Sequence, residues 1–313
     1  MRALVTGASG FIGSHVVSAL SAAGTQVRAY DLREPERLPP GVEFVAGDLL
    51  HPAALRAALD GCEVVFHLAA VYSYSPGDVA SMERVNVDGT RALIEAAGSR
   101  RIVHTSSCAT CGPVAGRAAT EADSPPRWEL RVAYKRTKLA GEQLALDAAR
   151  RGADIVVVNP TTPVGPADTR PTPTGKMVAD VARGKARAYL ARSALNVVAV
   201  EDVARGHVLA LERGRAGRRY LLGGENLPMR DVFALIARAA GRPAPRVAIP
   251  WSAAYGAALI AARLRGEPRL LNLDEVRIAR RPMLFDDSRA RTELGYSSEP
   301  AAGAIARAVA ALV

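Results

Sequence analysis

The chain has 313 residues, 49% of them hydrophobic and 23% charged, which suits two modest domains or one domain with a large elaboration. Its net charge of +10 does not predict nucleic-acid binding, because the arginines are scattered along predicted helices and aromatic residues, at 5%, are too few for stacking platforms. No apolar stretch reaches the ~20 residues of a membrane span, and three cysteines without a secretory signal predict a cytoplasmic protein.

The first predicted elements are a strand at residues 3–5, a glycine turn and a helix. Gly7, Gly10 and Gly13 follow the strand with the spacing G-x-x-G-x-x-G. A turn without Cβ atoms lets the backbone approach a diphosphate closely, and the helix that it opens points N–H groups at the anion. We therefore expect a dinucleotide to bind at this loop, with contacts from Gly7, Ser9, Gly10, Phe11, Ile12 and Gly13.

The next predicted strand, at residues 26–30, leads into Asp31. A carboxylate at the end of this strand can accept hydrogen bonds from both hydroxyls of an adenosine ribose, and it would repel a 2′-phosphate. NAD is therefore favoured over NADP. Arg33 leaves NADP open, because its guanidinium could turn onto a 2′-phosphate.

Strands and helices then alternate along the chain. Predicted strands at 42–49, 63–70 and 101–107 are separated by amphipathic helices. This order predicts an α/β protein with a doubly wound parallel sheet of the Rossmann type, and with ligands at the carboxyl ends of the strands. Asp48 either recognises the adenine or caps the helix that follows. The further cofactor contacts expected here are Asp48, Leu49, Leu68, Ala69, Ala70 and Thr105.

Three polar residues downstream form a candidate catalytic group. Tyr134 and Lys138 are four residues apart on a predicted long helix, so they share one face, and Ser107 lies at the end of the fifth strand. A phenol ordinarily titrates near ~10, and a neighbouring ammonium would bring its pKa toward the working pH. Lys138 can also hold the nicotinamide ribose. Ser107 would hydrogen-bond the substrate oxygen and fix its distance from Tyr134.

Cys108 and Cys111 have the spacing of a redox or metal pair. The sequence has no second pair of ligands to complete a four-ligand zinc site, and the setting is not that of a thioredoxin-type site. We therefore interpret both cysteines as small packing residues beside the active site, and we predict no metal site.

The segments "TGASGFIG", "GDL", "HLAA", "NVDGT", "SSCATCG", "YKRTK" and "NPTTPVGP" occur in this order. In this the chain resembles the extended short-chain dehydrogenases/reductases (the NAD-dependent epimerase/dehydratase family) over essentially its whole length. The resemblance implies a homodimer and a catalytic Ser107, with Ser106 in support. It also implies that Asn86 braces the active site, although a helix cap is nearly as good an interpretation. The positions that it adds are Pro160 and Pro163 for the cofactor, and Cys108 and Thr162 for the substrate.

Members of this family oxidise, reduce, epimerise or dehydrate their substrates. Dehydratases follow the catalytic hydroxyl with acidic residues, whereas Cys108 and Ala109 stand there in this chain. Residues 159–176 and 220–245 resemble a subgroup called hopanoid-associated sugar epimerases, which is related to dihydroflavonol reductases. We predict an NAD(P)-dependent oxidoreductase that transfers a hydride between nicotinamide and a secondary alcohol or ketone.

The alternative is a nucleotide-sugar epimerase with tightly held NAD. Two departures from such epimerases argue against it: Thr162 replaces a substrate-binding Asn, and residues 195–197 lack an Arg for the diphosphate. Other arginines could take over that task, and the candidates are Arg187, Arg280 and Arg281.

The predicted dinucleotide-binding domain comprises residues 1–160 and 195–222. Residues 161–194 and 223–313 form the smaller, discontinuous C-terminal domain, which binds a small-molecule substrate. The Pro-rich segment 165–175 is either a loop over the substrate or a plain linker. Several apolar residues either line an apolar pocket or belong to the hydrophobic core, namely Leu190, Leu195, Leu259, Ile260 and Leu264.

Overall fold

The computed structural model describes residues 1–263 and 273–312. In the first half of the chain the elements are β1 (Arg2–Thr6), α1 (Phe11–Ala22), β2 (Gln26–Asp31), β3 (Glu43–Ala46), α2 (Pro52–Leu59), β4 (Val64–His67), η1 (Pro76–Asp78), α3 (Val79–Met82), η2 (Glu83–Gly89), α4 (Thr90–Ala97), β5 (Arg101–Thr105), η3 (Cys108–Thr110), η4 (Arg127–Arg131) and α5 (Ala133–Arg150).

In the second half they are β6 (Ile155–Pro160), β7 (Thr162–Val164), α6 (Pro173–Ala182), β8 (Ala188–Leu190), β9 (Ala194–Ala199), α7 (Val200–Arg213), β10 (Arg219–Leu222), β11 (Glu225–Pro228), α8 (Met229–Ala239), β12 (Val247–Ile249), α9 (Trp251–Arg263), α10 (Leu273–Ile278), α11 (Ser288–Leu294) and α12 (Ala301–Ala310).

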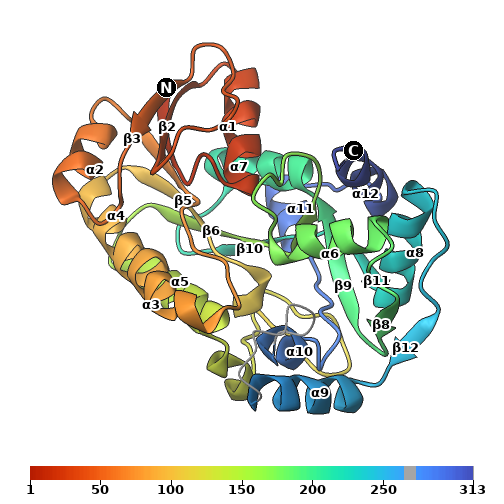
Figure 1. Ribbon diagram of the computed structural model, residues 1–313. Helices are drawn as coiled ribbons and strands as arrows, with labels where there is room; N and C mark the ends of the chain where they lie inside the picture. The colour runs from red at the N-terminus through yellow and green to blue at the C-terminus, as the bar shows by residue number, and fades with distance from the viewer. Residues whose placement is uncertain (264–272, 313) are drawn as a thin grey trace.

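The predicted doubly wound sheet is confirmed. It has seven strands in the order β10-β6-β5-β4-β1-β2-β3, and every neighbouring pair is parallel. The strand order reverses between β1 and β4, so the chain leaves these two strands in opposite directions and opens a crevice at their carboxyl ends. Gly7, Leu68 and Ser107, which the sequence predicts to contact cofactor or substrate, follow β1, β4 and β5 at this edge; the strands are labelled in Figure 1.

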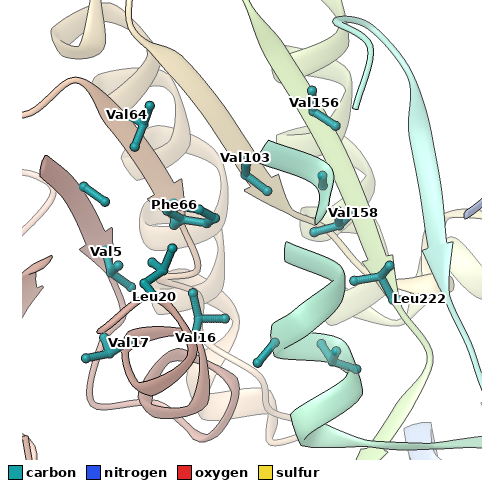
Figure 2. Close-up of a cluster of buried hydrophobic side chains, with 14 of the residues drawn as sticks. Val5, Val16, Val17, Leu20, Val64, Phe66, Val103, Val156, Val158 and Leu222 are labelled. Carbon is teal, nitrogen blue, oxygen red and sulfur yellow. The ribbon is translucent and has the colours of Figure 1, made fainter. Parts of the chain in front are cut away.

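Helices bury both faces of the sheet, which is why its strands are almost continuously apolar. On one face, Val5, Phe66 and Val103 of neighbouring strands point toward Val16 and Leu20 of α1, as Figure 2 shows. The helices α7 and α11 complete this layer. Fully burying one such side chain contributes ~1.5–3 kcal/mol to the stability of the fold. On the other face, α2, α4 and α5 cover the alternate strand residues, and this layer positions the helix that carries the candidate catalytic residues.

A smaller unit lies beside the large sheet. Its sheet has the order β11-β9-β7, and α6, α8 and α12 pack around it (Figure 1). A two-stranded sheet of β8 and β12 and the helices α9 and α10 lie next to this unit. The division at residues 160, 194 and 222 stays a prediction. The structure adds that β9 pairs within the small sheet and that α11 packs on the large one.

Candidate active site

A cavity of about 750 Å³ lies at the carboxyl edge of the large sheet and extends under the smaller unit. The residues directly after β1, β4, β5 and β6 line it, as expected for a ligand site in a doubly wound fold. Of the residues predicted to contact cofactor or substrate, all but one line this cavity: Gly7, Ser9, Gly10, Phe11, Ile12, Gly13, Asp31, Asp48, Leu49, Leu68, Ala69, Ala70, Thr105, Ser107, Cys108, Tyr134, Lys138, Pro160, Thr162 and Pro163.

The exception is Arg33. Its side chain is exposed and does not line the cavity. The chain bends after β2, where the Leu32 N–H donates to Asp31 Oδ1 at 2.7 Å, and this bend carries Arg33 away from the site. Asp31, which favours NAD, therefore lines the cavity, whereas Arg33, which left NADP open, does not.

The three glycines of the first loop have different tasks. Gly7 has a φ of +70°, and a Cβ on Gly13 would lie 2.0 Å from the Gly7 carbonyl oxygen, so these two glycines are required by the backbone itself. A Cβ on Gly10 would meet only the Gly7 carbonyl oxygen, at 3.1 Å. Gly10 also gives α1 no side-chain cap, which leaves the first N–H groups of the helix open to a ligand. This cradle fits a dinucleotide diphosphate.

Two carboxylates lie near this cradle. Asp31 Oδ2 accepts a hydrogen bond from the Ser9 N–H at 3.0 Å, so it fixes the glycine loop while it faces the cavity. Asp48 Oδ1 accepts from the Leu50 N–H at 3.0 Å, and Asp48 also lines the cavity. This bond closes a local turn before α2, whose N-cap is His51 and which has no side-chain cap, so Asp48 does not cap the helix, and its contact with the adenine stays a prediction.

The candidate catalytic residues meet at the ends of β5 and α5. Tyr134 lies in the first turn of α5, and hydrogen bonding by the Ser107 side chain lowers the pKa of its phenol. Lys138 follows one turn later and donates from Nζ to the Thr105 carbonyl oxygen at 2.7 Å. The Ala109 N–H donates to Ser107 Oγ at 3.2 Å, and this bond restrains the position of the Ser107 hydroxyl. All three side chains line the same cavity as the glycine loop.

Burial is the largest cause of the pKa shifts of Tyr134 and Lys138. Burial raises the pKa of Tyr134 well above its ordinary range, the neighbouring Tyr72 raises it further, and the Ser107 hydrogen bond acts in the opposite direction. Burial lowers the pKa of Lys138 to about 8, opposed by the carboxylate of Glu142. Tyr134 is therefore a protonated phenol at neutral pH. The sequence predicts a lowering by Lys138, but Lys138 is not among the groups that shift this pKa.

Sequence reasoning missed the aromatic side chains above Tyr134. The ring of Tyr72 lies 4.3 Å from that of Tyr134, and its hydroxyl is 3.1 Å from that of Tyr74. Asn86 holds this segment by a pair of hydrogen bonds with the backbone of Val71, at 2.8 and 3.0 Å, and its amide also donates to Thr137 of α5. Asn86 lies in the π-helical η2, and it braces the site rather than capping a helix. No local pattern predicts these contacts.

A buried polar network supports the Ser107 turn. Asn159 Nδ2 donates to the Ser107 carbonyl oxygen at 3.1 Å, to Thr110 Oγ1 at 3.0 Å and to Glu142 Oε2 at 2.6 Å. Arg219 Nη1 pairs with Glu142 Oε1 at 2.8 Å. Because burial makes each unpaired polar group costly, this network favours one arrangement of the turn.

The two cysteines of the C-x-x-C pattern are buried and free. Cys111 packs in a cluster with Ala119, Leu221 and Phe285. Burial raises the pKa of Cys108 to about 12 and that of Cys111 further, so both thiols stay protonated at neutral pH. This agrees with their interpretation as packing residues.

The substrate end of the cavity has an apolar lining with a few charges. Tyr72, Tyr74, Met177, Leu195, Met229, Ile278 and Met283 contribute to it. Of the apolar residues predicted to line a pocket or belong to the core, Leu195 lines the cavity and Leu190 packs beside α9. Leu259 and Ile260 lie outside the lining, and Leu264 is outside the described residues.

Three arginines were candidates for an anionic substrate group. Arg281 lines the cavity, and Arg187 does not. Arg280 is held between the rings of Trp128 and Trp251, with its guanidinium carbon 5.3 Å from each ring centroid.

Three buried histidines predict an acid-sensitive fold. Burial lowers the pKa of His67 to about 3 and that of His207 to about 4, and it lowers the pKa of His104 well below its ordinary value. In the unfolded chain each histidine titrates near ~6.5. As the pH falls below that value the unfolded state takes up protons that the fold excludes, and each histidine costs up to ~1.4 kcal/mol of stability per pH unit.

A His104→Phe substitution should remove one of the three histidine contributions to the loss of folding stability at low pH. Neither ring nitrogen of His104 has a hydrogen-bond partner among the described residues, and the side chain is 2% exposed. Urea unfolding at neutral pH and at about pH 5 should show that the stability of the variant relative to the wild type rises by about 2 kcal/mol on acidification. His51→Gln, at an exposed position, is the control. A constant difference between His104→Phe and wild type would contradict the prediction.

None of the helices in the described ranges is both long and apolar enough to cross a membrane.

Residues 3–223 match the NAD dependent epimerase/dehydratase family. A Synechocystis protein named dihydroflavonol 4-reductase is 38% identical over 97% of this chain and 92% of its own length. The sterol demethylase protein B of Methylococcus capsulatus is 37% identical over 99% of this chain and 98% of its own length. The solved structure of Thermus thermophilus UDP-glucose 4-epimerase in complex with NAD covers 100% of this chain and 99% of its own, with a TM-score of 0.78 and 26% identity.

These similarities extend over nearly the whole chain and agree with the resemblance found in the sequence motifs. They also agree with a cavity in which a glycine loop, a carboxylate at the end of β2 and a Ser-Tyr-Lys group meet. The chain belongs to the NAD-dependent epimerase/dehydratase family of the extended short-chain dehydrogenases/reductases.

Proposed function

We propose that the protein exchanges a hydride between NAD(H) and a secondary alcohol or ketone. The observation that carries this proposal is that Ser107, Tyr134 and Lys138 line one cavity with the glycine loop and Asp31. When bound, the nicotinamide cofactor supplies or accepts the hydride, and its oxidised ring adds a positive charge. Asp31 lines the cavity whereas Arg33 does not, which supports NAD over NADP.

The proton moves through Tyr134. Since burial keeps this phenol protonated at neutral pH, Tyr134 is suited to donate its proton to the carbonyl oxygen when a ketone is reduced. Ser107 hydrogen-bonds the same oxygen and holds it within reach of the phenol. Lys138, fixed by the Thr105 carbonyl, orients the nicotinamide ribose, and the positive charge of the oxidised nicotinamide ring would stabilise the phenolate left after proton transfer.

The substrate is a ketone with a sizeable apolar body. Met177, Met229 and Met283 give the cavity a polarisable, adaptable wall, and the tyrosines above Tyr134 add flat apolar surface. The names of two relatives, a dihydroflavonol reductase and a sterol demethylase protein, support a substrate of this kind.

Nucleotide-sugar epimerisation is the second candidate function. It is favoured by Arg281, which lines the cavity and could offer its guanidinium to an anionic substrate group; in the structure the guanidinium carbon lies 6.0 Å from the Trp128 ring centroid. The similarity to the Thermus thermophilus epimerase also supports it.

The dinucleotide content of freshly purified protein separates the two functions. The protein is denatured, and any released dinucleotide is identified and counted per chain. A dehydrogenase must exchange its cofactor in every cycle, so we expect a largely empty protein that binds added NADH reversibly. Near-stoichiometric NAD that survives purification would instead favour the epimerase, because its cycle never releases the cofactor. A protein that binds neither NAD nor NADP would contradict both.

A further inference from the structure

The segment between β7 and α6 reaches across the cavity to the glycine loop. Arg170 donates from Nη2 to the Ser9 carbonyl oxygen at 2.9 Å and to Ser9 Oγ at 3.1 Å. These two residues are 161 positions apart in the sequence. Ser9 immediately precedes Gly10, whose missing side chain leaves the diphosphate cradle open. The guanidinium of Arg170 therefore lies at the edge of that cradle.

The backbone of this segment is fixed independently of Arg170. His15, one turn into α1, donates from Nε2 to the Pro166 carbonyl oxygen at 3.0 Å. Asp168 accepts hydrogen bonds from the Thr172 N–H at 3.1 Å and from its hydroxyl at 2.8 Å, which closes a turn with Arg170 at its tip. Arg170 itself is exposed. Its side chain can thus change partners while the turn stays in place.

The charges on this side of the cavity require a cation. Asp31, Asp48 and Asp168 all line it, and three carboxylates would repel a dianionic diphosphate. Of the other basic residues of the lining, Lys138 bonds to Thr105 and Lys135 pairs with Glu129, while Arg281 lies over the Trp128 ring, with its guanidinium carbon 6.0 Å from the ring centroid.

Arg170 forms no ion pair in the described part of the chain. A guanidinium offers a forked set of donors that matches two phosphate oxygens, and such charge-assisted bonds are stronger than those of backbone N–H groups alone.

We propose that Arg170 binds the diphosphate of the dinucleotide, so that the 165–172 turn belongs to the cofactor site and not only to the substrate site. The inference rests on the proposed function only in that a dinucleotide binds in this cavity. It makes the smaller unit a partner in cofactor binding, because α6 follows the turn directly. The proposal supports the interpretation of this segment as a loop over the cavity and not as a plain linker.

The test compares ligands with and without a diphosphate on three proteins: wild type, Arg170→Gln and Arg170→Lys. NADH binding is followed by its fluorescence, and ADP-ribose and adenosine are measured by competition. Loss of a charge-assisted pair is expected to weaken NADH and ADP-ribose by about 10- to 100-fold in Arg170→Gln. Adenosine should bind as it does to the wild type. Arg170→Lys should recover part of the loss, and the salt dependence of ADP-ribose binding should be smaller in Arg170→Gln.

His15→Gln is the matched control, because it removes the other anchor of the turn without removing a charge from the cradle. If Arg170 only held the turn, both variants would weaken all three ligands alike, and this result would overturn the inference. Equal ADP-ribose binding by wild type and Arg170→Gln would do the same. A wild-type protein that binds no ADP-ribose would overturn the cofactor site itself. Failure of hydride transfer alone would leave the binding result intact, because ADP-ribose cannot exchange a hydride.

Discussion

A Tyr134→Phe enzyme is expected to lose turnover of any ketone that the wild type reduces, by about 100- to 10,000-fold, while its affinity for NADH stays unchanged. The substitution removes one oxygen atom and keeps the ring, so the packing against Tyr72 at 4.3 Å is preserved. What is lost is the buried, protonated phenol that would donate to the carbonyl oxygen. Steady-state kinetics and an NADH titration on the same preparation measure the two quantities.

The matched control is Tyr189→Phe. Tyr189 lies on β8 against Phe233, outside the cavity lining, and loses the same oxygen atom without touching the site. It should retain wild-type turnover. If Tyr134→Phe kept turnover within a few-fold of the wild type, the proton would come from another group and the assignment of Tyr134 would be wrong.

The glycine loop should respond very differently to two substitutions that each add a single methyl group. Gly13→Ala places a Cβ 2.0 Å from the Gly7 carbonyl oxygen and 3.1 Å from the Ala8 Cα. The backbone of the turn must move, so we expect a loss of stability of about 3 kcal/mol or more. Thermal unfolding should show this as a melting temperature lower by ~6 °C or more.

Gly10→Ala should instead fold almost as well as the wild type, because its Cβ meets only one backbone oxygen, at 3.1 Å. The methyl group would enter the cradle where the diphosphate lies, so NADH binding should weaken by about 10-fold or more. If Gly10→Ala bound NADH like the wild type, the diphosphate would not lie on this cradle. If Gly13→Ala left the melting temperature unchanged, the close approach of Gly13 to Gly7 would be incorrect.

Local pattern was enough to predict the large sheet and most of its ligand edge. Apolar runs such as residues 155–158 specify buried strands, and the glycine triplet, Asp31 and the Tyr134–Lys138 spacing each reflect contacts within one strand–turn–helix unit. Because parallel strands place their carboxyl ends at one edge, these separate local signals combine into one site without knowledge of the distant contacts. Ser107 was placed with Tyr134 in this way.

The site residues that the sequence analysis did not predict depend on contacts between segments far apart in the sequence. Arg170 meets Ser9 across 161 positions, and Glu142 meets Arg219 across 77. Tyr72 lies in an irregular segment whose position is set by Asn86, and no periodicity marks it as a neighbour of Tyr134. Arg33, whose place after β2 suggested a contact, is exposed and does not line the cavity, so its contact with a cofactor stays a prediction.

The most direct test of the proposed activity is the fate of a deuteride. The protein is incubated with NADH that carries deuterium at both hydrogen positions of nicotinamide C4 and with a panel of apolar ring and chain ketones, and products are analysed by mass spectrometry. The proposal predicts one deuterium on the new carbinol carbon for each NADH oxidised, and no transfer by Tyr134→Phe. Absence of transfer to every ketone, together with interconversion of nucleotide sugars without net use of NADH, would contradict it and establish the epimerase in its place.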